Sequence, residues 1–310
     1  MSLFRLNPVI LLAGLAAGAA SALQPGTYTA EVNGHNAPLT VKVTVDANRI
    51  TSIDTSKNLE TIGVGKVALD KVGRKILKYQ SINVDSVTGA SFSSAALKEG
   101  VKQCLIKAGA DMKQFEKKAE FHPIHDRTYE ADVVIVGGGG AGLASAISSM
   151  QAGAKKVIVL EKLGYLGGST NVSGAALNAV DDKRQKAQGI QDSFETFYQS
   201  TMKGGHNVGN PELVRYMTRH SIDAVHWMES LGVKFKDHIG AATGSLGQRS
   251  HYPVDPSGNA YIRVFEKVIA DSNGKIQVLL DTPAKSLIQD KSGRVIRVVA
   301  DNFRSKVTVK

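Results

Sequence analysis

The stretch "ADVVIVGGGGAGLASAISSMQAGAKKVIVLEK", residues 131–162, decides the fold of the larger part of this chain. Residues 133–136 are a continuous apolar run, which is typical of a buried strand in a parallel sheet. A glycine-rich turn and a stretch of helical character follow, and a second apolar run ends at Glu161. This order of strand, glycine turn, helix and strand predicts a Rossmann-like α/β domain.

The glycine turn has the spacing of a dinucleotide-binding site. Gly137, Gly139 and Gly142 fit G-x-G-x-x-G, and Glu161 follows Gly142 by 19 residues at the end of the second strand. Glycines let the backbone approach a pyrophosphate, the helix N-terminus stabilises its charge, and the carboxylate binds ribose hydroxyls. A glycine-rich turn that binds no nucleotide is the alternative.

The sequence after Glu161 favours FAD over NAD. "GYLGGSTNVSGAALNA", residues 164–179, contains a second Gly-Gly turn with hydroxyl residues, which offers further N–H groups to the same phosphates. Residues 210–231 predict a helix with Asn210 as its N-cap and a proline in its first turn. From residue 275 onwards, strands alternate with turns, and Asp290 to Gly293 predict a hairpin turn. We expect these strands to form a short antiparallel layer on the nucleotide domain.

The chain before residue 113 predicts a second, smaller unit. Alternating apolar residues between 26 and 56 indicate three antiparallel strands, and residues 62–79 have helical spacing. A further helix is expected from Ser91 to about Gly109. We therefore predict a small α+β domain over residues 23–112, a charged linker over 113–130, and the α/β domain over 131–310.

One polar turn in this smaller unit has two possible roles. In "VDSVTGASFSSAALKEG", residues 84–100, Thr88-Gly89-Ala90-Ser91 lead directly into a helix. Hydroxyl residues and glycine at a helix start commonly cap its free N–H groups. The same geometry suits an anion, because the helix N-terminus is positive and small residues leave room for it. The spacing alone leaves both interpretations open.

Composition restricts the class of protein. A chain of 310 residues that is 42% hydrophobic is long enough for about two domains. The net charge of +10 is spread along the sequence without a basic motif interleaved with aromatics, so we expect no nucleic-acid partner. The single cysteine, Cys104, excludes an internal disulfide and a C-x-x-C-H haem site, and we expect it to be a buried thiol. His122 and His125 lack further ligands nearby, so we expect no metal site.

The first 22 residues predict an export signal. "MSLFRLNPVILLAGLAAGAASA" has one arginine, an apolar run of about 13 residues, and an Ala20-Ser21-Ala22 cleavage site. A membrane anchor is the alternative, but spanning a bilayer takes about 20 apolar residues. We therefore expect cleavage near Ala22 and a mature protein in the periplasm.

Taken together, these features resemble the soluble periplasmic fumarate reductase and urocanate reductase family of flavoproteins. The N-terminal unit is similar to an FMN-binding domain with the motif Asp-x-x-Ser/Thr-Gly-Ala-Thr/Ser, here Asp85, Thr88, Gly89, Ala90 and Ser91. The resemblance implies that Ser91 carries FMN through a phosphoester. The "LETIG" segment around Glu60 and Thr61 also matches.

The second unit resembles the FAD-binding domain of the same family. The glycine pattern and the resemblance imply FAD contacts from Gly137, Gly139, Ala141, Gly142, Glu161, Lys162, Gly168, Ser169, Thr170, Ala175, Ala176 and Ala284. Three departures occur: Ser169 replaces an asparagine, Ala175-Ala176 replace a Gly-Gly pair, and "HYPVDPSG" replaces a more usual His-Arg-Pro-Thr-Gly-Gly. Because no haem motif accompanies the FMN unit, the chain is more similar to the urocanate reductases than to the tetrahaem fumarate reductases.

The resemblance also implies a function. A full-length relative would take electrons from a membrane quinol-oxidising donor into FMN, pass them to FAD, and reduce a small α,β-unsaturated carboxylate. A flavin transferase would attach the FMN. The family's catalytic residues, and the strand that completes its FAD sheet, fall after the position of Lys310. His251 is not the matching histidine, so we expect no catalytic residue and no activity from these 310 residues alone. The alternatives are a two-flavin electron carrier, a truncated remnant, or an FAD oxidase or dehydrogenase of the same fold.

Overall fold

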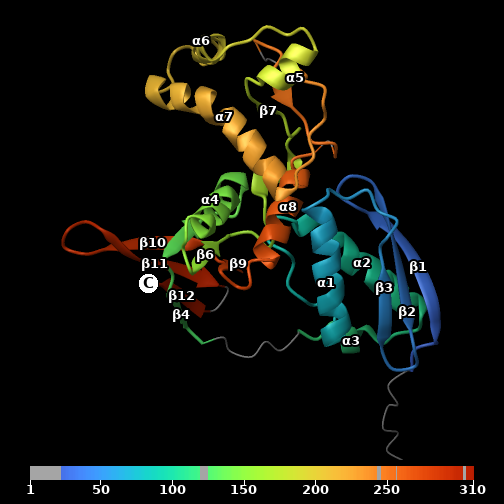
Figure 1. The fold of residues 1–310 in the computed structure, drawn as a ribbon. Coiled ribbons are helices and arrows are strands. Elements are labelled where there is room, and N and C mark those ends of the chain that lie inside the picture. Colours follow the sequence, from blue (N-terminus) through green and yellow to red (C-terminus); the bar gives the residue numbers. More distant parts are fainter. Residues whose placement is uncertain (1–21, 119–124, 243–245, 256, 303–304) are drawn as a thin grey trace, which may run out of the picture.

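The computed structural model describes residues 22–118, 125–242, 246–255, 257–302 and 305–310. The predicted export signal, apart from Ala22, and His122 therefore lie outside the described residues. The chain forms two units, an N-terminal one on the right of Figure 1 and a larger one that follows it. Among the described residues, no helix has both the length and the apolar character needed to cross a membrane.

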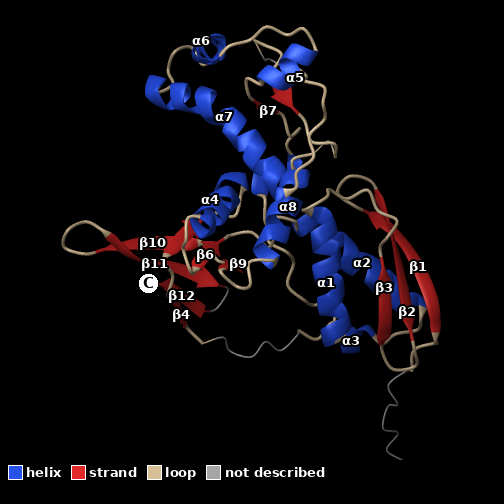
Figure 2. Cartoon of the chain, viewed as in Figure 1, coloured by secondary structure: helices blue, strands red, loops and turns tan. Residues whose placement is uncertain are grey.

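The N-terminal unit is an antiparallel sheet with helices on one face (Figure 2). Strands β1 (Gly26–Asn33), β2 (Pro38–Val45) and β3 (Ile50–Asp54) pair in that order. Helices α1 (Gly65–Tyr79) and α2 (Ser91–Lys107) pack on the sheet, and α3 (Met112–Phe115) follows. The alternation in β2 buries Leu39, Val41, Val43 and Val45, and each such side chain contributes about 1.5–3 kcal/mol to folding. Cys104 is buried in this core, as predicted.

The larger unit is built on the predicted βαβ element. Strands β5 (Val133–Val136), β6 (Val157–Leu160) and β9 (Ile276–Leu279) form a parallel sheet, with β6 in the centre. Helices α4 (Gly140–Gln151) and α8 (Asn259–Ala270) cover one face. The assignment of residues 276–279 to the antiparallel tail was wrong. All four residues of β6 are buried, so this strand requires a hydrogen-bonding neighbour on each side, and β9 supplies the second one.

The rest of the tail forms the predicted antiparallel layer. Strands β10 (Ala284–Gln289), β11 (Val295–Asn302) and β12 (Ser305–Val309) are antiparallel neighbours, and β4 (Arg127–Tyr129) pairs with β12 in parallel. The predicted hairpin turn is present, since Gly293 N–H donates to the Asp290 carbonyl. The segment predicted as a linker, 113–130, thus contains most of α3 and all of β4. This layer covers the face of the parallel sheet opposite α4, where Ile158 and Leu160 contact Val298 and Val307.

A helical region extends from the parallel sheet at the top of Figure 1. It contains the 3-10 helix η1 (Gly168–Val172), β7 (Leu177–Asn178), α5 (Asp182–Ala187), α6 (Phe194–Gly204), α7 (Pro211–Leu231) and β8 (Ser250–His251). The predicted cap of α7 is confirmed, because the Asn210 side chain accepts hydrogen bonds from the N–H groups of Glu212 and Leu213.

Candidate cofactor sites

The polar turn of the N-terminal unit leaves its hydroxyl groups free of helix capping. Helix α2 begins at Ser91, and its N-cap, Ala90, makes no side-chain cap hydrogen bond. Ser94 holds the turn from inside instead, accepting from the Val87 N–H (3.1 Å) and donating to the Ala90 carbonyl (2.8 Å). The interpretation in which Thr88 or Ser91 caps the helix is therefore wrong. Ser91 is exposed at the positive end of a 17-residue helix, which fits a hydroxyl that carries a phosphate.

Positive charge lies beside this turn. Lys75 Nζ donates to the Asp85 carbonyl (3.4 Å), and Lys98 Nζ donates to Ser86 Oγ (3.1 Å). Burial lowers the pKa of Lys98, and the neighbouring Asp85 carboxylate opposes that shift. Asp85 itself is exposed, so two ammonium groups and one carboxylate surround the start of the motif. This charge balance favours a bound phosphate.

A buried carboxylate holds the "LETIG" loop against the first turn of α2. Glu60 is only 4% exposed and accepts hydrogen bonds from the His35 N–H and from Ser93 Oγ, both at 2.6 Å. Three exposed apolar side chains, Leu59, Ile62 and Phe92, lie in this loop and this turn. They offer an apolar surface of the kind on which a flavin ring packs next to its attachment point.

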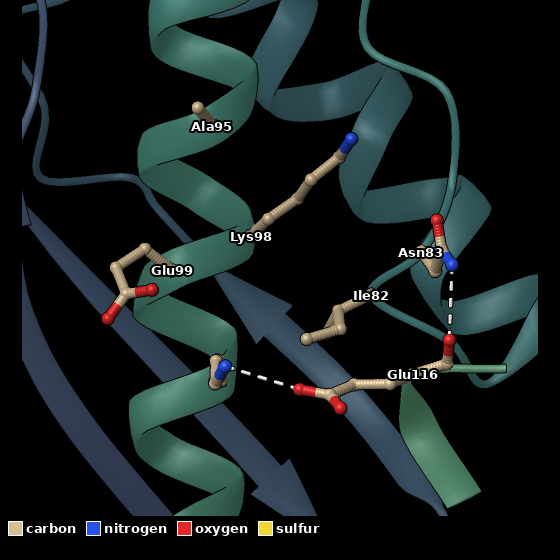
Figure 3. Close-up of a pocket in the computed structure, with 7 residues that line it drawn as sticks. Ile82, Asn83, Ala95, Lys98, Glu99 and Glu116 are labelled. Carbon is tan, nitrogen blue, oxygen red and sulfur yellow. Dashed lines mark hydrogen bonds and ion pairs between the residues drawn. The ribbon is translucent and has the colours of Figure 1, made fainter. Parts of the chain in front are cut away.

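A pocket of about 560 Å³ lies along the middle of α2 and shares only Lys98 with the charged groups beside the motif. Figure 3 shows its lining residues, among them Ile82, Asn83, Lys98 and Glu116. Lys102 is ion-paired with Glu116 at 3.2 Å, and the Asn83 amide donates to the Glu116 carbonyl. None of residues 85–91 lines it, and Lys98 and Glu99 have hydrogen-bond partners outside its lining, Ser86 and Gln103, so we assign no cofactor to it.

Glycine suits each of the three positions of the FAD turn for a different structural reason. Gly137 has φ +102°, a conformation that other residues rarely adopt. A Cβ at Gly142 would lie 1.9 Å from the Gly137 carbonyl oxygen, so this position must be glycine for α4 to pack against the turn. A Cβ at Gly139 would meet no atom within 4 Å, so the space beside this residue is open. An open, side-chain-free approach at the N-terminus of α4 is what a pyrophosphate requires.

Glu161 lies directly beside this turn. Its side chain is buried and accepts hydrogen bonds from the N–H groups of Gly138 (2.6 Å) and Leu163 (2.7 Å). A carboxylate has about four acceptor positions, so two remain for ribose hydroxyls. The residues present therefore fit the ADP part of FAD.

The other predicted FAD contacts differ in how exposed they are and in what they contact. Thr170 Oγ1 accepts from the Gly140 N–H at 3.3 Å, which brings η1 to the start of α4. Ser169, Lys162, Ala141 and Ala176 are exposed, and Gly168 has φ +47°. Ala175 is buried with φ +61°, and its carbonyl accepts from the Tyr261 hydroxyl. Ala284 is half-buried and packs against the core between the two sheets.

His251 takes part in a buried polar cluster and not in an open site. Its Nε2 lies 3.1 Å from Asp181 Oδ2, and its Nδ1 lies 3.2 Å from two carbonyl oxygens. The side chain is fully buried, so both ring nitrogens are used within the fold. Among the described residues, no group of three or more histidine, cysteine, aspartate or glutamate side chains is arranged to bind a metal ion.

The two cofactor sites touch through residues that the sequence did not reveal. The Gly164 N–H donates to the Thr88 carbonyl (3.2 Å), and Lys71 Nζ donates to the Gly164 carbonyl. Leu163 and Tyr165 pack into the core of the N-terminal unit. Residues 163–165 lie between Glu161 and the second Gly-Gly turn, but no pattern in them signals a partner 76 residues away.

Comparisons with known proteins identify both domains. The FMN-binding domain family matches residues 34–106, and the FAD binding domain family matches residues 132–310. The chain is 34% identical over 278 residues to a urocanate reductase of Eggerthella lenta, an alignment that covers 89% of this chain and 46% of that protein. It is 31% identical over 265 residues to an NADH:fumarate oxidoreductase of Klebsiella pneumoniae, covering 86% of this chain and 28% of that protein.

The fold of part of the chain also has a solved counterpart. The open conformation of a flavocytochrome c3 fumarate reductase superposes with a TM-score of 0.54 and 29% identity, covering 59% of this chain and 32% of that one. The chain thus spans less than half the length of these relatives. With an FMN-binding domain followed by an FAD binding domain, it belongs to the flavoprotein family that includes the urocanate and fumarate reductases.

Proposed function

We propose that this chain is the flavin-binding part of a reductase of α,β-unsaturated carboxylates. FMN is esterified through its phosphate to Ser91, and FAD is held without a covalent bond at the Gly137–Gly142 turn. The names of the relatives, a urocanate reductase and an NADH:fumarate oxidoreductase, support this substrate class.

The two flavins supply the redox chemistry. When bound, they would relay two electrons from a reduced donor to a carbon–carbon double bond, which would gain a hydride at one carbon and a proton at the other. The residues of this chain hold the phosphates at two helix N-termini and the ribose at Glu161. Gly138 and Leu163 orient the Glu161 carboxylate through their N–H groups.

The observation that carries this proposal is the contact between the two sites. The backbone of the FMN turn, at Thr88, is hydrogen-bonded to the segment that follows Glu161. A protein that merely stored two flavins would not require this contact, whereas electron transfer between them does require proximity.

We further propose that the protein is exported to the periplasm, receives its FMN from a flavin transferase there, and is reduced by a membrane quinol-oxidising donor. The predicted signal over residues 1–22 supports the location. NADH is the competing donor, since two relatives are named for it. Reduction of the purified protein by NADH, with none by a quinol-oxidising membrane fraction, would overturn the donor assignment.

Intact-mass measurement tests the FMN site. After co-expression with a flavin transferase, denatured wild type is expected to carry one FMN minus one water, and Ser91→Ala none. Ser91→Thr provides the control, because the motif allows either hydroxyl residue at this position and the variant is expected to keep the adduct. Persistence of the adduct in Ser91→Ala would refute the attachment site.

FAD retention tests the second site. Replacing Glu161 by alanine removes charge-assisted hydrogen bonds and is expected to weaken FAD binding by about 1–3 kcal/mol. Retention is measured by gel filtration followed by release of flavin from the denatured protein. Equal FAD content in wild type and Glu161→Ala would contradict the proposal.

A further inference from the structure

We propose that two glycines, Gly63 and Gly89, and the four side chains that face them form a fixed docking contact that holds the FMN site against the FAD site. The facing side chains are Leu163, Tyr165, Asn171 and Asn259, and we call the six residues the seam. This inference rests on the proposed function for its purpose, the positioning of the two flavins, but the contact itself can be tested without any flavin.

Gly63 forms the first half of the seam. It ends the "LETIG" loop of the FMN unit with φ +77°, and a Cβ there would lie 2.5 Å from Asn259 Nδ2 and 2.8 Å from Asn171 Oδ1. Both asparagines are buried, and they are hydrogen-bonded to each other at 2.8 Å. Asn171 lies in η1 of the FAD site, and its amide also donates to the Leu166 carbonyl (2.6 Å).

Gly89 forms the second half. It lies in the FMN motif itself with φ +87°, and a Cβ there would lie 2.9 Å from Leu163 and 3.1 Å from the ring and hydroxyl of Tyr165. Burial raises the pKa of Tyr165, and the charge of Glu161 raises it further. Tyr165 therefore lies against the FMN turn and also interacts electrostatically with Glu161, the carboxylate assigned to the FAD ribose.

A lysine adds a third link beside the seam. Lys71, on α1 of the FMN unit, donates to the Gly164 carbonyl, while the Gly164 N–H donates to Thr88. Burial lowers the pKa of Lys71, and the Asp281 carboxylate of the FAD unit opposes that shift. Both backbone polar groups of one residue, Gly164, thus pair across the domain boundary.

The seam has the features of a contact that selects one arrangement. Two loops of the FMN unit approach the FAD unit so closely that only glycine fits at each point of contact. Within the part of the chain that the structure describes, the buried Asn259 Oδ1 has no hydrogen-bond partner, and such groups are few in native structures. Since residues 60 and 91 flank the proposed FMN site and residues 161 and 171 flank the FAD site, the seam sets the separation of the two flavins.

Two matched glycine variants test the seam. Gly63→Ala and Gly109→Ala place a Cβ on residues of nearly equal φ, +77° and +76°, so the two variants are matched in this backbone angle. A Cβ at Gly109 meets no atom within 4 Å, whereas one at Gly63 meets both asparagines. The readout is hydrogen exchange at the Gly164 amide, followed in peptides covering residues 162–166, because this N–H is bonded across the boundary.

We expect Gly63→Ala to increase exchange at Gly164 about tenfold or more relative to Gly109→Ala, as for a local opening. In the flavin-loaded protein, the same variant is expected to slow the redistribution of electrons between the flavins after photoreduction, with both flavin contents unchanged. Asn259→Ala, which removes the facing amide without backbone strain, is expected to increase exchange in the same direction. It also keeps the test informative if Gly63→Ala does not fold.

Equal exchange at Gly164 in Gly63→Ala, Asn259→Ala and Gly109→Ala would overturn the seam. Increased exchange with an unchanged rate between the flavins would overturn its role in positioning them. If FMN were not attached at Ser91, the proposed function would fail on the mass measurement, while the exchange experiment would still decide whether the seam exists.

Discussion

At the scale of single residues, two glycines of the same turn are expected to respond in opposite ways to a methyl group. Gly142→Ala puts a Cβ 1.9 Å from the Gly137 carbonyl, so α4 must move away from the turn. Overpacking of this kind costs about 1–3 kcal/mol or more. We expect a lower midpoint of denaturant unfolding for the larger unit.

Gly139→Ala is the matched control, because its Cβ points into open space. It is expected to leave the unfolding midpoint nearly unchanged but to lower FAD retention, since the methyl group occupies the approach of the pyrophosphate. Equal loss of stability in both variants would contradict this division of roles.

A second residue-scale prediction concerns acid stability. Burial alone would raise the pKa of Asp181, but hydrogen bonds from the Arg184 backbone and from the His251 and Arg184 side chains lower it to about 2. A lowered folded-state pKa stabilises the protein above the unfolded value of about 3.9, and that contribution is lost as pH falls toward 2. The contribution is about 2 kcal/mol.

Urea unfolding at pH 5 and pH 2.5 measures this effect. Wild type is expected to lose more stability between these two pH values than Asp181→Asn, which has no carboxylate to titrate. A larger loss in the variant would show that Asp181 is not the group responsible.

Sequence analysis singled out residues that act together within one short segment. Gly137, Gly139 and Gly142 act at one turn, and their spacing revealed it. Asn171 and Asn259 are 88 residues apart, and an isolated asparagine in a polar loop has no periodicity that points to a partner. Ala284 packs against a core between two sheets, and only the folded topology brings those sheets together.

At the scale of elements, replacing two helical glycines of the smaller unit by alanine is expected to change its stability in opposite directions. A Cβ at Gly73 of α1 would meet only Leu97 at 3.8 Å, whereas one at Gly100 of α2 would lie 2.5 Å from Val41 of β2. Gly73→Ala is expected to stabilise the unit by about 0.5–1 kcal/mol through helix propensity. Gly100→Ala is expected to destabilise it by about 1–3 kcal/mol, because α2 is pushed off the sheet.

Thermal unfolding followed by circular dichroism separates the two variants. A rise in Tm for Gly100→Ala would mean that α2 does not approach β2 as closely as the structure shows.

A helix or strand could be predicted where its own sequence pattern determines its type and place. It could not be predicted where a strand distant in the sequence determines its pairing. The helix over 210–231 has its cap and its spacing in the sequence. Strand β9 has an apolar run that fits either sheet, and only the buried β6 beside it decides the choice. Strand β4 has three residues, two of them exposed, and exists because β12 pairs with it.

At the scale of the whole molecule, the two units are expected to unfold separately. Except for Leu163 and Tyr165, the core of the smaller unit consists of residues from Leu23 to Phe115. Within the described residues, β5 is paired on one side only, and Val136 on it is 57% exposed. An open apolar edge of a parallel sheet leaves hydrogen-bonding groups and apolar surface in water.

We therefore expect two transitions in denaturant, with the unit over residues 125–310 unfolding first. Residues 22–118 expressed alone are expected to unfold cooperatively, and tryptophan emission from Trp227 reports the other unit in the full chain. A single transition at which both units unfold together would show that the seam couples them more strongly than their separate cores allow.

The pairing of β4 with β12 also has a consequence for synthesis on the ribosome. Asp126 Oδ1 accepts a hydrogen bond from the Lys306 N–H, 180 residues later, at the end of the strands that pair in parallel. At translation rates of 5–20 residues per second, the nascent strand waits roughly 10 to 40 s for its partner to emerge. The smaller unit, whose core apart from Leu163 and Tyr165 is encoded before Asp126, has that interval in which to fold first.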